Sequence, residues 1–133
     1  MLGAQVFEIS EARWFSPEGR AVTRIFRSEK AELLVVGWEP GQESSRHQHG
    51  DSESLVLVLE GEITVNPGTV DVRQARAGTV IATEPRSFHQ LRNASDKRCL
   101  TLHFYAPSMA GAISAPLLDL SVQAYPREDK PQI

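Results

Sequence analysis

The stretch SSRHQHGDSESLVLVLEGEITV, residues 44–65, places two histidines one residue apart shortly before five consecutive apolar residues. Alternate residues of a strand project from the same face, so His47 and His49 can present their imidazoles side by side. The apolar run Leu55–Leu59 is bounded by turn residues, a pattern typical of a strand buried on both faces. The stretch therefore predicts that two imidazoles stand at the mouth of a packed core.

Short strands separated by turns dominate the rest of the chain. Clusters of Gly, Pro, Asn and Asp, such as SPEG (16–19) and NASDK (93–97), interrupt the apolar segments at close intervals. This spacing predicts an all-β fold, an antiparallel sandwich or barrel, rather than alternating strands and helices. Segment 108–120 could hold one short helix before Pro116, and residues 117–133 are expected to form a C-terminal tail. The expected strands are Val6–Ile9, Ala21–Phe26, Leu33–Trp38, Leu55–Leu59, Glu62–Val65, Thr69–Arg73, Thr79–Ala82, Ser87–Leu91 and Cys99–Tyr105.

Length and composition limit the classes of protein to consider. The 133 residues fit one domain, 1–133, with a core at about residues 20–107. With 14 basic and 17 acidic residues the formal charge is −3, which argues against a nucleic-acid partner. No apolar run reaches the roughly 20 residues of a membrane helix, and the N-terminus lacks a signal-peptide pattern. A single cysteine, Cys99, fits a reducing compartment, so we expect a cytoplasmic protein without a membrane partner.

The histidines form the most specific chemical pattern. Glu53 is four residues after His49, so in a continuous strand the two side chains would project from the same face. His89 can complete the ligand set from a later strand. Neutral imidazoles suit Fe, Zn, Ni and Cu, and a carboxylate widens the choice towards Mn. The pattern predicts a metal site made by His47, His49, His89 and Glu53. Glu53 could alternatively orient a histidine from outside the ligand set or act as a general base.

The segment CLTLHFYAP (99–107) alternates with a period of two. Cys99, Thr101, His103 and Tyr105 share one face, and leucines and a phenylalanine share the other. A polar face turned to water would more often carry Lys, Glu or Asp. The series Thr101, His103 and Tyr105 therefore predicts a hydrogen-bonded relay in a pocket, with a buried pair satisfying its own polar groups as the alternative.

Two motifs resemble those of the cupin superfamily over about residues 33–106. The first is G-x5-H-x-H-x3-E-x7-G, from Gly41 to Gly61, and the second is G-x6-P-x3-H-x3-N, from Gly78 to Asn93. The final spacing of the first motif is one residue longer than usual, and the second lacks a glycine after its proline. The resemblance implies an antiparallel β-barrel (a double-stranded β-helix, or jelly roll) with a metal held by three histidines and one glutamate.

A narrower resemblance is to thiol dioxygenases of the cysteine dioxygenase type. WEPGQESSRHQHGDS (38–52) is similar to that family's W-x-x-G-x-x-S-S-x-H-x-H-x-x-S run, and TLHFY (101–105) to its S-x-H-x-Y strand. The resemblance implies Fe(II) on His47, His49 and His89. It also implies that Tyr105, oriented by His103 and Thr101, faces the bound ligands. It also implies that Arg24, in VTRIF, binds the substrate carboxylate. Glu53 departs from this family's three-histidine site, and Ser54 stands where the mammalian enzymes carry a cysteine.

These patterns lead to one favoured function and two alternatives. We expect an Fe(II) dioxygenase that oxidises a small thiol, such as cysteine or a mercapto-acid, with O2; Mn, Ni, Zn or Cu are the other candidate metals. The alternatives are an oxygenase or isomerase acting on a non-thiol small molecule, and a cupin that binds a ligand or senses a metal without catalysis. Ligation by Glu53 would weaken the thiol hypothesis. We also expect a homodimer, since sheet edges favour pairing between copies.

Overall fold

Two antiparallel sheets make up the fold of the computed structural model, which describes residues 3–109, 117–118 and 122–125. The larger sheet has the strand order β10-β1-β2-β8-β3-β6, with β9 pairing to β1, and the smaller has the order β5-β4-β7. In the large sheet the strands are β1 (Arg20–Arg27), β2 (Glu32–Trp38), β3 (Glu53–Glu60), β6 (Val80–Thr83), β8 (Cys99–Ala106), β9 (Leu117–Leu118) and β10 (Val122–Tyr125). In the small sheet they are β4 (Glu62–Val65), β5 (Arg73–Arg76) and β7 (Leu91–Arg92).

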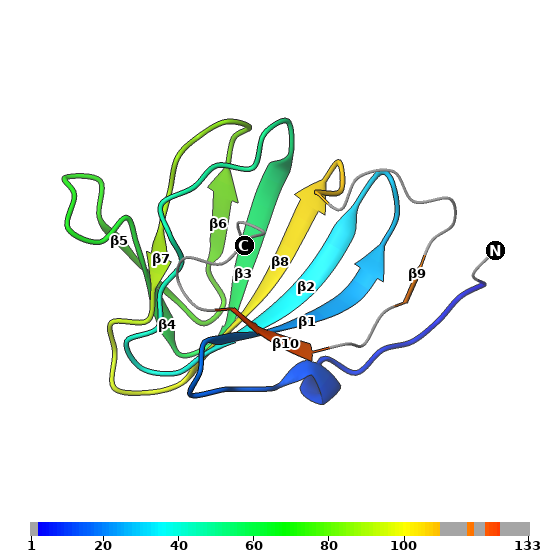
Figure 1. The fold of residues 1–133 in the computed structure, drawn as a ribbon, viewed down its shortest axis with the longest axis horizontal. Coiled ribbons are helices and arrows are strands. Elements are labelled where there is room, and N and C mark those ends of the chain that lie inside the picture. Colours follow the sequence, from blue (N-terminus) through cyan, green and yellow to red (C-terminus); the bar gives the residue numbers. More distant parts are fainter. Residues whose placement is uncertain (1–2, 110–116, 119–121, 126–133) are drawn as a thin grey trace.

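Figure 1 shows the large sheet as a continuous twisted surface, with the small sheet on its β3 and β6 side. The only helix among the described residues is a single 3-10 turn, η1 (Ile9–Ala12). The prediction of an all-β antiparallel fold is confirmed. None of the helices in the described ranges has the length and apolar character needed to cross a membrane.

Alternation along the strands separates an inner core from an outer one. In β2, Leu34, Val36 and Trp38 point inward, while Val35 lies on the outer face. The inner core comprises Val22, Leu34, Val36, Trp38, Val58, Ile63, Ala75, Leu91, Cys99 and Tyr105. It draws residues from both sheets and therefore holds them together.

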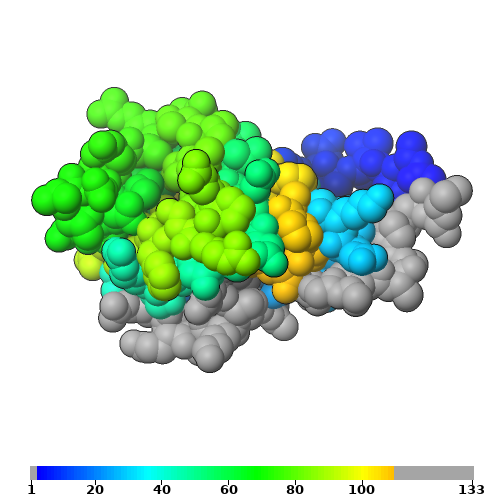
Figure 2. Space-filling view, turned by 90° about the horizontal axis from the view of Figure 1, so that it is seen from above, coloured from blue at the N-terminus to red at the C-terminus, as the bar shows by residue number. Residues whose placement is uncertain are grey.

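The N-terminal segment packs on the outer face. Phe7, Ile9 and Phe15 contact the outer core that contains Val35 and Leu100. The strand predicted at Val6–Ile9 is wrong, because these apolar residues serve packing against a sheet and do not pair with a strand. In Figures 1 and 2 the start of this segment (blue) lies at the opposite end of the molecule from the residues around 66–80 (green), whereas Arg13, further along it, reaches Glu60 and forms an ion pair at 2.6 Å.

Several strand predictions need correction. The strand expected at Thr69–Arg73 is wrong, because residues 66–72 form turns and β5 begins only at Arg73. The apolar run in β3 is not buried on both faces, since Val56 and Val58 are buried whereas Leu55 is 45% exposed. Continuous hydrophobicity misled here because it does not report which face another element covers.

The C-terminal part differs from the expected tail. Residues 117–118 and 122–125 pair antiparallel with β1, which gives β1 partners on its outer edge. The helix considered within 108–120 falls mainly on residues 110–116, which lie outside the described residues.

Candidate metal centre

A short antiparallel bridge brings the first and last histidines of the set together. The backbone N–H of His47 donates to the carbonyl of His89 at 2.9 Å, and that of His89 donates back at 2.8 Å. His49 follows two residues after His47, and the three rings lie with their centroids 4.5–4.7 Å apart. Each ring offers one nitrogen, and the three nitrogens lie within 4.8 Å of one another. All three side chains are buried.

The Nδ1 atoms of these rings have partners that set their tautomers. His47 Nδ1 lies 2.6 Å from the carbonyl oxygen of Ser45, and His89 Nδ1 lies 3.1 Å from that of Ser87. A carbonyl only accepts, so each Nδ1 carries the hydrogen and donates. His49 Nδ1 lies 3.0 Å from the sulfur of Met109, also an acceptor. The three Nε2 atoms are therefore left with free lone pairs, as metal ligands require.

These lone pairs fit a cation. His47 Nε2 is buried and has no hydrogen-bond partner among the described residues. The Nε2 atoms of His49 and His89 lie 3.0 Å apart, and with both hydrogens on Nδ1 neither can donate to the other. A divalent transition metal between the three rings would satisfy every one of these atoms, so the residues present fit the ion that the sequence implied.

The protonation states also suit ligation. Burial lowers the pKa of His47 to about 4, further lowered by the charges of His89 and Arg20 and partly offset by the hydrogen bond to Ser45. Burial and the neighbouring histidines lower the pKa of His49 to about 3. Burial likewise lowers the pKa of His89. At neutral pH the rings are neutral, the state in which imidazole binds metal.

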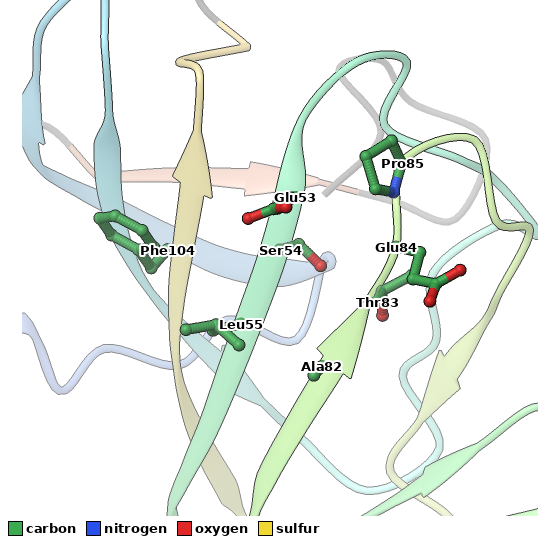
Figure 3. A pocket seen from close by; sticks show the side chains of 8 residues that line it. All are labelled: Glu53, Ser54, Leu55, Ala82, Thr83, Glu84, Pro85 and Phe104. Atoms are coloured by element: carbon green, nitrogen blue, oxygen red, sulfur yellow. The ribbon is translucent and has the colours of Figure 1, made fainter.

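Glu53 is not brought to the three histidines. Its side chain is exposed and lines a pocket of about 370 Å³ on the outer side of β3 and β6, with Leu55 and Phe104 (Figure 3). The prediction that Glu53 shares a strand face with His49 is wrong because residues 49–52 form a turn. In this turn the Ser52 N–H donates to the His49 carbonyl, and Gly50 has a φ of +59°. The turn breaks the strand alternation on which the prediction depended.

Ser54, the next residue, takes the inward position instead. It is buried and lies opposite Tyr105 in the register of β3 and β8. Its hydroxyl has no hydrogen-bond partner within the described part of the chain. The pair therefore occupies the inner face of the barrel beside the histidines, because the Tyr105 ring centroid lies 4.8 Å from that of His49.

A line of hydrogen bonds runs through the core to Tyr105. Trp38 Nε1–H donates to Thr101 Oγ1 at 2.8 Å, and Thr101 Oγ1 lies 2.7 Å from His103 Nε2. The other nitrogen of the ring, His103 Nδ1, lies 3.1 Å from the Tyr105 hydroxyl oxygen. All four side chains are buried. The sequence predicted the last three members of this line and missed Trp38, whose indole N–H needs a partner when buried.

The indole sets the direction of the line. Trp38 can only donate, so the Thr101 hydroxyl receives that bond and offers its own hydrogen, for which His103 Nε2 at 2.7 Å is closer than the Val36 carbonyl at 3.4 Å. His103 then carries its hydrogen on Nδ1 and donates to the Tyr105 oxygen, which leaves the Tyr105 O–H free to donate into the site. Burial lowers the pKa of His103 to about 3, so the ring is neutral.

Two arginines of β1 lie on the inner side of the sheet. Arg24, the residue expected to bind a carboxylate, is half-buried and pairs in register with Leu34. Burial and Glu32 raise the pKa of Tyr105, and the charges of Arg20 and Arg24 oppose that rise. Arg20 is buried, with its guanidinium carbon 5.6 Å from the centroid of the Trp38 ring. Sequence reasoning missed Arg20, although its parity with Val22 and Arg24 was a usable signal.

Comparisons with known proteins agree with this architecture. A family described as cupin domain matches residues 34–105 of the chain. The structure of TT1209 from Thermus thermophilus is 26% identical, with a TM-score of 0.72, and the match covers 78% of this chain and 98% of that one. An uncharacterized conserved protein with a double-stranded β-helix domain from Klebsiella pneumoniae is 19% identical at a TM-score of 0.72, covering 90% and 100% of the two chains. An RmlC-like cupin protein from Desulfovibrio desulfuricans is 24% identical at a TM-score of 0.69, covering 79% and 98%.

Proposed function

The chain belongs to the cupin domain family, and we propose that it is an iron(II)-dependent dioxygenase of a small thiol, such as cysteine or a mercapto-acid. The observation that carries the proposal is the three-histidine cluster, from which Glu53 is turned away. Three neutral ligands leave the full charge of a divalent ion uncompensated. Such a centre favours an anionic ligand, and a thiolate is an anion that binds well to transition metals such as iron.

His47, His49 and His89 would hold the metal through Nε2, while each Nδ1–H donates to its own acceptor: the Ser45 carbonyl, the Met109 sulfur and the Ser87 carbonyl, respectively. When bound, iron(II) supplies positions for a thiolate and dioxygen together, and the redox chemistry between them. The partners on Nδ1 keep each ring in one tautomer and one orientation, so the chain itself fixes the geometry of the ligand set.

Tyr105 is proposed to act on the bound reactants. The line from Trp38 through Thr101 and His103 directs the Tyr105 O–H towards the histidine cluster, where it can donate to a negatively charged ligand. Burial keeps this phenol protonated, because it raises the pKa of Tyr105. Arg24, on the same side of the site, is proposed to bind the carboxylate of the thiol.

A second candidate is an oxygenase or isomerase for a non-thiol small molecule that binds the metal through two oxygens. Ser54 favours this candidate, because a buried serine opposite Tyr105 leaves the tyrosine without the cysteine partner that the mammalian thiol enzymes have. A cupin that binds a small ligand without catalysis has the same three-histidine cluster and differs only in turnover.

Oxygen uptake separates these functions. Protein loaded with iron(II) is mixed with a panel containing cysteine, 3-mercaptopropionate and cysteamine, and dissolved oxygen is followed together with the sulfinate product. We expect uptake with at least one thiol and loss of uptake in His89→Ala, which removes one ligand. Full iron occupancy without uptake for any thiol would exclude thiol oxidation and leave the non-thiol and binding roles.

A further inference from the structure

The pocket on the outer side of β3 and β6 takes no part in the proposed metal chemistry. Its floor spans three neighbouring strands, because Leu55 lies opposite both Phe104 of β8 and Ala82 of β6 in the strand register. Leu55 is 45% exposed and Phe104 is 38% exposed, so a continuous apolar surface faces the pocket (Figure 3). At about 370 Å³ the pocket is in the size range of sites for small organic molecules.

Two carboxylates border this apolar floor. Glu53 begins β3 and Glu84 directly follows β6, and both side chains are exposed. The described residues that line the pocket include no Lys, Arg or His, and the ion pairs found within the described ranges all use other acids. Even Arg86, two residues after Glu84, pairs with Asp51 instead. The pocket therefore offers two uncompensated negative charges beside apolar surface.

This pocket is separate from the candidate metal centre. Ser54 stands between Glu53 and Leu55 on β3 and also borders the pocket. It is 2% exposed, its hydroxyl has no hydrogen-bond partner in the described part of the chain, and it lies opposite Tyr105 in the register of β3 and β8. Strand β3 therefore divides the pocket from the histidine cluster, and a molecule bound in the pocket does not need the metal.

We propose that this pocket binds a small amphiphilic amine, in which a primary ammonium group is carried on an aromatic or branched apolar body. The ammonium group has three N–H donors for the carboxylates of Glu53 and Glu84, which only accept. The apolar body covers Leu55 and Phe104, and the ring face of Phe104 also attracts a nearby cation. A neutral or anionic molecule of the same shape gains only the apolar contacts. The pocket thus selects cations, and it does so independently of the proposed dioxygenase activity.

The test uses phenethylamine, 2-phenylethanol and phenylacetate, which carry a cationic, a neutral and an anionic group on nearly the same apolar body. Binding to full-length protein labelled with 15N is followed by NMR titration at pH 7.5. Phenethylamine should bind about fivefold to thirtyfold more tightly than 2-phenylethanol, as expected for two partly exposed ion pairs, and phenylacetate should bind most weakly. Glu53→Gln and Glu84→Gln should each weaken amine binding about threefold, and the double variant should bring amine and alcohol within about twofold of each other.

Glu18→Gln, which removes an exposed acid outside the pocket, is the matched control and should keep the wild-type preference for the amine. Equal binding of amine and alcohol to wild-type protein would overturn the site, as would an amine preference that survives in the double variant. Chemical-shift changes should centre on residues 53–55, 82–85 and 104; changes centred on 47–49 and 89 would place the amine at the histidine cluster and refute the proposal.

A second copy of the chain is the other occupant that this apolar face could receive. Amine binding that declines as the protein concentration rises would show that a second copy covers the pocket, and it would overturn the amine site. Oxygen uptake with thiols is a separate measurement, so its absence would refute thiol oxidation and leave the amine site standing.

Discussion

Replacing Thr101 with valine removes the hydroxyl at the centre of the hydrogen-bonded line and keeps the shape of the side chain. Two buried groups then lose their partner, the Trp38 indole N–H and the His103 Nε2 atom. Each buried polar group left without a partner costs about 1–3 kcal/mol, so with two such groups the free energy of unfolding should fall by about 2–6 kcal/mol. That is a large part of the roughly 5–15 kcal/mol typical of a small protein.

Thr23 supplies the matched control. It is as deeply buried as Thr101, but its hydroxyl has no hydrogen-bond partner among the described residues. Thr23→Val therefore removes a buried hydroxyl that has no partner in the described part of the chain, and it should leave the stability unchanged or raise it by up to about 1 kcal/mol. Urea unfolding at pH 7.5, followed by tryptophan fluorescence and circular dichroism, measures both variants. Equal losses in the two variants would refute the line of hydrogen bonds, because the chemical change is the same and only the partners differ.

Three further predictions concern the histidines, the cysteine and the assembly. Burial lowers the pKa of His47 to about 4 and that of His49 to about 3, against 6.5 for an ordinary histidine. Below pH 6.5 these histidines therefore bind protons in the unfolded chain while they stay neutral in the folded protein. The unfolding free energy of metal-free protein should therefore fall as the pH drops from about 6.5 towards 4, by up to about 1.4 kcal/mol per pH unit for each histidine, and equal stability at pH 7.5 and 5.0 would contradict this. Cys99 is buried, and burial raises its pKa to about 12, so it should not react with a thiol reagent such as DTNB until urea unfolds the protein; rapid labelling of native protein would be the contrary result. The homodimer stays a prediction: β6 is an edge strand of the large sheet, and light scattering should give twice the mass of the 133-residue chain rather than one.

The parts of the site that lie on regular strands could be predicted from the sequence. Thr101, His103 and Tyr105 alternate within β8, and the period of two places them on one face without further information. His47 and His49 were identified from their spacing, and His89 from its place in the second motif. These predictions needed only local regularity or a motif that the family shares.

The parts that depend on turns and on neighbouring elements could not be predicted in the same way. Glu53 was placed by counting through residues 49–52, where a turn resets the alternation. The partner of His49, Met109, lies beyond the C-terminal end of β8, and no spacing in the sequence indicates that contact. Burial of Arg20 depends on what packs over β1, which hydrophobicity along one strand does not report.

The most direct test of the three-histidine metal centre is the metal content of matched variants. Wild-type, His89→Ala and Glu53→Ala proteins are loaded with iron(II) without oxygen, desalted, and analysed for metal per chain by mass spectrometry. We predict one equivalent in wild-type protein, one in Glu53→Ala because that side chain is exposed on the outer face, and strong loss in His89→Ala. Full occupancy in His89→Ala, or loss of the metal in Glu53→Ala, would contradict the account.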